Sequence, residues 1–137
     1  INRIIIPRMK KNLSGNIVHV GSIASYEGVG SIGYNSSKAA LAAYVRTLGR
    51  TLNRYKIIMT GILPGGFIAH ENAMHRLRTK NKKIYNDFIK QRLPRKKMGT
   101  ALELLPMIDL LCSSDASMMG GCLIPMDAGE SKSYFYF

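Results

Sequence analysis

The chain contains no tryptophan and only two cysteines in 137 residues. Cys112 and Cys122 form no Cys-x-x-Cys pair and have no histidine companion, so neither a metal site nor a disulfide framework is predicted. We expect both to be reduced, buried thiols of a cytoplasmic protein. No apolar run approaches the roughly 18 residues of a membrane span, so no membrane contact is expected. An apolar fraction of 46% instead suits a globular core.

His70 and His75 are further candidates for metal ligands. The zinc motif of metalloproteases places two histidines four residues apart on one helical face. Here they are five residues apart, which puts them on different sides of a helix. No metal is predicted.

Acidic residues are scarce: the chain has eight aspartates and glutamates and 20 lysines and arginines. Ten of these cations fall in residues 76–97, where Asp87 is the only acid. The same segment has helical apolar spacing, carried by Ile84, Tyr85, Phe88, Ile89 and Leu93. We interpret it as a helix with a solvated basic face. An anionic substrate and a nucleic-acid contact remain open, and we expect nucleic acid to bind only weakly and without sequence preference.

Tyr34 and Lys38 are the most informative pair in the chain. In a helix they lie one turn apart on the same face, so the ammonium can stabilise the anion of the phenol. Ser22 precedes them and adds a hydroxyl, so that a phenol, an ammonium and a hydroxyl could meet one carbonyl group. This combination indicates proton-transfer chemistry. Tyr-x-x-x-Lys spacing alone also arises by chance in a lysine-rich chain.

Three segments have the pattern of buried parallel strands. Residues 15–22, 56–63 and 120–127 are apolar runs, and each is followed by a polar or glycine-containing turn. Ligand sites of open α/β sheets lie at such carboxyl ends. The rest is predicted as a helix ending near Asn12, a loop to Gly33, a helix to about Asn53, and a helix from a capping-box Thr100 to about Ser113.

Taken in order, these motifs resemble the short-chain dehydrogenase/reductase family. The resemblance rests on Gly21-Ser22, Tyr34-x-x-x-Lys38 with Ala39-Ala40-Leu41, Pro64-Gly65 and Asp127-Ala128-Gly129, and it covers nearly the whole chain. It implies an α/β fold with a Rossmann-like, doubly wound parallel sheet, of which only the carboxyl-terminal half is expected here. Residues 1–137 would be one partial Rossmann-fold domain, with a basic substrate lid over 70–98.

The resemblance also implies roles for individual residues. Tyr34 would exchange a proton with the substrate oxygen, and Lys38 would stabilise the Tyr34 anion and bind the nicotinamide ribose. Ser22, or less favourably Ser25, would hold the substrate oxygen. The reaction would be hydride transfer between NAD or NADP and a small carbonyl or alcohol compound.

Cofactor contacts are implied for a second set of residues: Tyr34, Lys38, Pro64, Gly65 and Ile68. Gly66 is an additional glycine relative to the family pattern, and Ala69-His70 stands where the family has a threonine. Ile68 would offer its backbone to the nicotinamide carboxamide.

A phosphate-binding turn of the family type is not found. Gly28-x-Gly30-x-x-Gly33 matches a dinucleotide fingerprint by letter, but it follows its strand at a distance and has no later acidic residue, so we predict a flexible loop. We therefore expect the amino-terminal cofactor-binding half to be absent. An inactive truncated fragment or an assembly partner is the alternative function, followed by a basic nucleic-acid-binding module. The family also implies a homodimer or homotetramer, and residues 131–137 are expected to pack on a neighbouring subunit.

Overall fold

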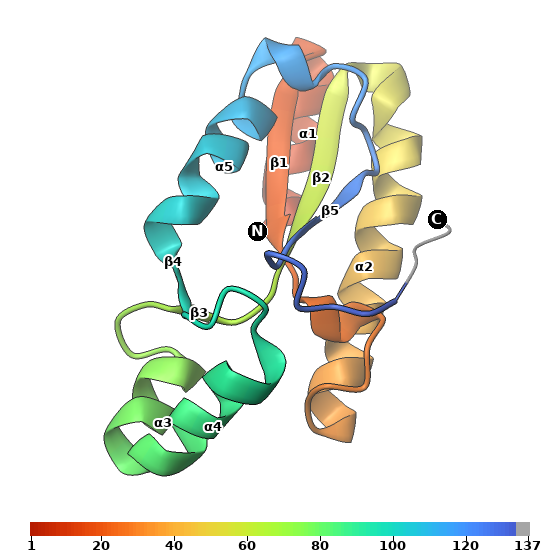
Figure 1. Ribbon diagram of the computed structural model, residues 1–137. Helices are drawn as coiled ribbons and strands as arrows, with labels where there is room; N and C mark the ends of the chain where they lie inside the picture. Colours follow the sequence, from red (N-terminus) through yellow and green to blue (C-terminus); the bar gives the residue numbers. More distant parts are fainter. Residues whose placement is uncertain (134–137) are drawn as a thin grey trace.

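A three-stranded parallel sheet carries the architecture of the protein, as the computed structural model shows for residues 1–133 (Figure 1). The helices and strands are α1 (Asn2–Asn12), β1 (Gly15–Val20), α2 (Ile32–Leu52), β2 (Ile57–Pro64), β3 (Phe67–Ile68), α3 (Ala73–Lys80), α4 (Lys82–Arg92), β4 (Gly99–Thr100), α5 (Leu105–Cys112) and β5 (Leu123–Met126). The prediction for the tail falls partly outside the described residues, because it includes 134–137.

The strand order of the sheet is β1-β2-β5, and both pairings are parallel. Val20 of β1 lies beside Ile62 of β2, and Pro64 of β2 lies beside Met126 of β5. The carboxyl ends of the three strands therefore meet at one edge of the sheet. All three predicted strands are confirmed. A separate two-stranded pairing joins β3 to β4 and lies beyond this edge.

Strand β2 is apolar on both faces because helices cover both of them. Ile57 and Met59 pack against α1 and α2, whereas Ile62 packs against α5 and the residues that precede it. All three side chains are fully buried. A strand that is covered on both faces has a continuous run of apolar residues in its sequence. Residues 56–63 could therefore be predicted as a buried strand.

Helix α2 begins at Ile32, earlier than predicted, because Ser31 caps it. The Ser31 hydroxyl accepts a hydrogen bond from the Tyr34 backbone N–H at 3.3 Å. Near its other end, a Cβ atom on Gly49 would lie 2.7 Å from the backbone of Gly121. The missing side chain thus lets the helix approach the chain that leads into β5.

Two helices, α3 and α4, lie in the segment predicted to be a substrate lid, and asparagines at 72 and 81 cap them. We refer to these two helices as the lid, and a lid function stays a prediction. Tyr85 and Leu93 are buried, and Phe88 and Ile89 are half-buried, as the apolar spacing predicted. Ile84 departs from the prediction, since it is 54% exposed. It precedes Tyr85 directly and so lies at the border of the apolar face, where the lid has no further layer to cover it.

The helix predicted from Thr100 is split in two. The capping box is confirmed, because the Glu103 carboxylate accepts a hydrogen bond from the Thr100 N–H at 2.7 Å. Residues 101–104 form a 3₁₀ helix, and α5 starts only at Leu105, with Pro106 in its first turn. Proline has no N–H for a bond to the preceding turn, so it favours this new helix start.

Cys112 and Cys122 are both free thiols, but the prediction that both are buried is wrong. Cys112 ends α5 on the solvent side and is exposed, and Cys122 is half-buried. Within residues 1–133, none of the helices combines the length and the hydropathy that crossing a membrane requires.

Thr60 in β2 provides a test of the core. Its side chain is fully buried, and its hydroxyl has no hydrogen-bond partner within residues 1–133. We expect Thr60→Val to raise the free energy of unfolding by about 1 kcal/mol, because it removes an unsatisfied buried polar group without changing the shape. Urea unfolding followed by circular dichroism measures this change.

Thr51→Val is the matched control, since the Thr51 hydroxyl is exposed and donates to the Thr47 carbonyl. It should not stabilise the protein. A destabilised Thr60→Val variant would contradict the assignment of an unsatisfied hydroxyl.

Candidate active site

A cavity of about 570 Å³ lies at the carboxyl ends of β1 and β2. Ser22, Tyr34 and Lys38 all line it, so the structure brings the three predicted catalytic residues together. Pro64 and Gly65 line the same cavity. The position agrees with the rule that open α/β sheets bind ligands where their strands end.

Ser22 is placed by the end of β1 and by a short 3₁₀ helix, Ile23–Ser25. Its hydroxyl accepts a hydrogen bond from the Ala24 N–H at 3.1 Å and caps this helix. Because the hydroxyl is the acceptor in that bond, its own proton can still be donated to a substrate oxygen. Ile23 and Ala24 are buried and hold the segment in place.

Ser25 has a structural position instead. Its hydroxyl donates to the Lys38 carbonyl at 3.1 Å, and it is not among the residues that line the cavity. This bond ties the serine segment to α2. The geometry therefore favours Ser22 over Ser25 as the hydroxyl that meets a substrate.

Tyr34 and Lys38 lie one turn apart on α2, as predicted. The Lys38 Nζ atom is 5.8 Å from the centroid of the Tyr34 ring and donates a hydrogen bond to the Val20 carbonyl at 3.2 Å. The ammonium thus lies between the end of β1 and the phenol. Tyr34 is 46% exposed, so its ring is open to a ligand in the cavity.

The loop that precedes α2 contains Gly28 and Gly30, whereas Gly33 lies in the first turn of α2. The predicted loop is found only as far as Ser31. Asn35 of α2 holds it, because the Asn35 side chain donates to the Glu27 carbonyl and accepts from the Gly30 N–H at 2.9 Å. Of the three glycines, Gly30 alone lines the cavity.

The turn after β2 brings backbone close to the cavity. Gly65, Gly66 and Phe67 line it, whereas Ile68 is not among the lining residues and pairs with Thr100 between β3 and β4. A cofactor contact by Ile68 stays a prediction. A Cβ atom on Gly65 would lie 2.6 Å from the Glu130 carboxylate and 2.7 Å from Asp127, so only glycine fits there.

Residues of the lid also line the cavity. Asn72, Met74, Phe88 and Arg92 line it from α3, α4 and the residue before α3. All ten cations of residues 76–97 are described, and Arg92 alone among them faces this cavity. The basic segment therefore presents most of its charge elsewhere.

Glu130 is a lining residue that sequence reasoning missed. Its side chain is buried, with the residue 5% exposed, and it forms an ion pair with Arg92. The available signal was its position directly after Asp127-Ala128-Gly129 in a chain with few acids. Sequence alone did not indicate which segment would supply its partners.

Three further titratable side chains, Tyr26, His70 and His75, do not line the cavity. Burial raises the pKa of Tyr26 to about 12, and the neighbouring carboxylates of Asp127, Glu27 and Glu130 add to this, so the phenol stays neutral. His70 and His75 have ring centroids 6.0 Å apart. The described part of the chain contains no group of three or more residues that could hold a metal ion.

Comparison with known proteins assigns the family. A family model described as enoyl-(acyl carrier protein) reductase matches residues 1–131. The chain belongs to the short-chain dehydrogenase/reductase family. This confirms the resemblance found in the motifs.

Two similar proteins show how far the match extends. Levodione reductase of Leifsonia aquatica is 31% identical over 134 residues, which cover 95% of this chain and 50% of that protein. A crystal structure of levodione reductase superimposes with a TM-score of 0.85 at 28% identity and covers 97% of this chain and 53% of that one. The predicted α/β, Rossmann-like fold is confirmed.

A third match concerns the fold alone. The structure of L-sorbose reductase from Gluconobacter frateurii, complexed with NADPH and L-sorbose, matches with a TM-score of 0.85 at 24% identity. The match covers 97% of this chain and 53% of that one. The chain spans about half the length of the relatives it matches.

The close approach at Gly65 gives a testable consequence. We expect Gly65→Ala to destabilise the protein by about 1–3 kcal/mol, because the added methyl group overlaps the Glu130 carboxylate and Asp127. Thermal and urea unfolding measure the change. Gly28→Ala is the control, since a Cβ atom at Gly28 would meet nothing within 4 Å. Equal stability of the two variants would contradict the tight packing of the turn.

Proposed function

We propose that the protein carrying this chain is an NAD(P)-dependent oxidoreductase that transfers hydride between a nicotinamide and a small carbonyl or alcohol compound. The observation that carries the proposal is the meeting of Ser22, Tyr34 and Lys38 on one cavity at the carboxyl edge of the sheet. Membership of a family whose relatives are named reductases and dehydrogenases supports it.

The residues around the cavity fit a nicotinamide. Gly65 and Gly66 present backbone without side chains, and Lys38 presents an ammonium to the same cavity. The related L-sorbose reductase binds NADPH, which supports NAD or NADP as the cofactor. Bound there, the cofactor would supply or accept the hydride. Tyr34, Lys38, Pro64, Gly65 and Ile68 remain the proposed contacts.

Each catalytic side chain has a separate task in this proposal. Ser22 donates a hydrogen bond to the substrate oxygen and fixes its position. Tyr34 gives its proton to that oxygen when a carbonyl is reduced, and takes the proton back when an alcohol is oxidised. Lys38 stabilises the resulting phenolate through its positive charge, which is why its place one turn from Tyr34 matters.

We further propose that the protein works in the cytoplasm as a homodimer or homotetramer. The two free thiols suit a reducing compartment. The apolar residues Leu41, Val45, Leu48 and Leu52 of α2 give the oligomer little support, because they pack in the core of the chain itself.

Replacement of the phenol tests the proposal directly. In the protein that carries this chain, we expect Tyr34→Phe to lower kcat at least about a hundredfold while cofactor affinity stays nearly unchanged. The change removes the transferable proton but keeps the ring, and positioned acid/base catalysis contributes about 10² to 10⁴ in rate. Turnover is measured by the absorbance of NADH or NADPH with a panel of ketones and alcohols.

Tyr44→Phe is the matched control, because it removes a phenolic hydroxyl from the same helix outside the cavity. It should retain normal turnover. If Tyr34→Phe turns over within about threefold of the unmodified protein, Tyr34 is not the acid/base.

A further inference from the structure

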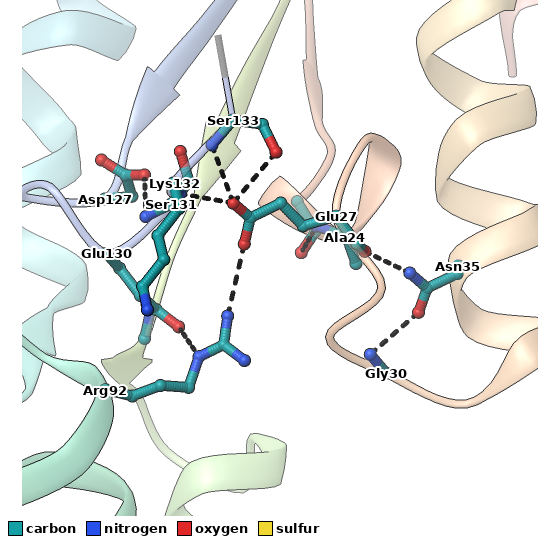
Figure 2. A network of polar contacts seen from close by, with 12 residues as sticks. Ala24, Glu27, Gly30, Asn35, Arg92, Asp127, Glu130, Ser131, Lys132 and Ser133 are labelled. Carbon is teal, nitrogen blue, oxygen red and sulfur yellow. Dashed lines mark hydrogen bonds and ion pairs between the residues drawn. The ribbon is translucent and has the colours of Figure 1, made fainter.

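A polar cluster borders the cavity and joins parts of the chain that are far apart in sequence. It consists of Glu27, Arg92 and Glu130 with the backbone groups they bind, and we refer to it as the Glu130 cluster (Figure 2). Glu27 lies before α2, Arg92 ends the lid helix α4, and Glu130 follows β5. None of these residues belongs to the set proposed for proton transfer.

Glu130 is bound at both oxygens of its carboxylate. Its Oε1 atom accepts from Arg92 Nε at 2.9 Å, and its Oε2 atom accepts from the backbone N–H of Gly66. A buried carboxylate is tolerated only when its charge is paired and its oxygens are hydrogen-bonded. Glu130 meets both requirements through the turn after β2 and through the lid.

Arg92 extends the cluster to a second carboxylate. Its Nη2 atom lies 3.4 Å from Glu27 Oε2, so one guanidinium bridges Glu27 and Glu130. The other oxygen of Glu27 accepts from the backbone N–H groups of Lys132 and Ser133 and from the Ser133 hydroxyl. The end of α4 is thereby tied both to the loop before α2 and to the segment after β5.

The additional glycine of the turn is explained by the same contacts. A Cβ atom on Gly66 would lie 3.1 Å from Phe88 and 3.2 Å from the Glu130 carboxylate and Leu93. At Gly65 the distance to the same carboxylate would be 2.6 Å. The pair of glycines therefore leaves room for Glu130 beneath the turn and for the lid against it.

We propose that Glu130 is a positioning residue, which sets the backbone of the Pro64–Gly66 turn through Gly66 and holds α4 over the cavity through Arg92. The functional role of Glu130 rests on the proposed oxidoreductase activity, because the turn and α4 border the cavity where cofactor and substrate would lie. Turn and lid then move as one unit, and Glu130 is the group that couples them.

Glu130→Gln tests this coupling in the full chain by amide hydrogen exchange. The substitution keeps the shape but removes the charge that pairs with Arg92. We expect exchange at Gly66 and along α4 to accelerate at least about tenfold, with α2 and the central sheet unchanged, because local opening has its own free energy. The matched control is Glu103→Gln, which breaks an ion pair with Arg95 at 2.7 Å on the protein surface. It should leave exchange at Gly66 and in α4 unchanged.

Kinetics of the protein that carries this chain give a second readout. Because Ser22, Tyr34 and Lys38 stay in place, we expect Glu130→Gln to raise KM at least about fivefold while kcat changes less than about twofold. Tyr34→Phe should instead lower kcat and leave KM nearly unchanged. If the unmodified protein has no NAD(P)-dependent turnover, the proposed function fails, and hydrogen exchange still decides the role of Glu130.

Three outcomes would overturn the role of Glu130: unchanged exchange at Gly66 and α4, acceleration spread evenly over the central sheet, or an equal response to Glu103→Gln. Should Glu130→Gln fail to fold, Arg92→Lys is measured instead. It keeps the charge but loses the planar fork that bridges two carboxylates. Local acceleration in α4 supports the proposal, and exchange like that of the unmodified protein overturns it.

Discussion

The enclosure of β2 is the constraint on which the rest of the structure depends. This strand has a parallel neighbour on each side and a helical layer on each face, so nearly all of its residues are buried. Its hydrophobic burial and its two ladders of hydrogen bonds leave it a single register. The turn that follows β2 therefore has a fixed position, directly beside the end of β1.

The candidate site follows from that register. Because β1 and β2 run parallel, Ser22 and the Pro64–Gly66 turn emerge at the same edge of the sheet. Helix α2 then returns across the sheet and places Tyr34 and Lys38 opposite them. Three short stretches of sequence thus meet at one cavity, and the glycines at 65 and 66 let a fourth, around Glu130, pack beneath the turn.

The strands, α2 and the three residues that meet in the cavity could be predicted from the sequence, because they depend on local patterns. Buried parallel strands give apolar runs, and Tyr34 and Lys38 are related by one helical turn. Exposure was harder to predict: Ile84 and Cys112 have suitable residue types for a core but lie where no further layer covers them. The Glu130 cluster was beyond local patterns, since Gly66, Arg92 and Glu130 come together only through the tertiary fold.

The contact between Gly49 and Gly121 has a consequence for the distant cavity. Tyr34 lies 15 residues before Gly49 on one uninterrupted helix, which is about 22 Å at 1.5 Å per residue. If the helix turned about this contact by roughly 3°, the phenol would shift by about 1 Å, a displacement comparable to those that impair catalysis. The alignment of the phenol proposed as the acid/base is thus set partly by two residues that have no side chain and lie outside the cavity.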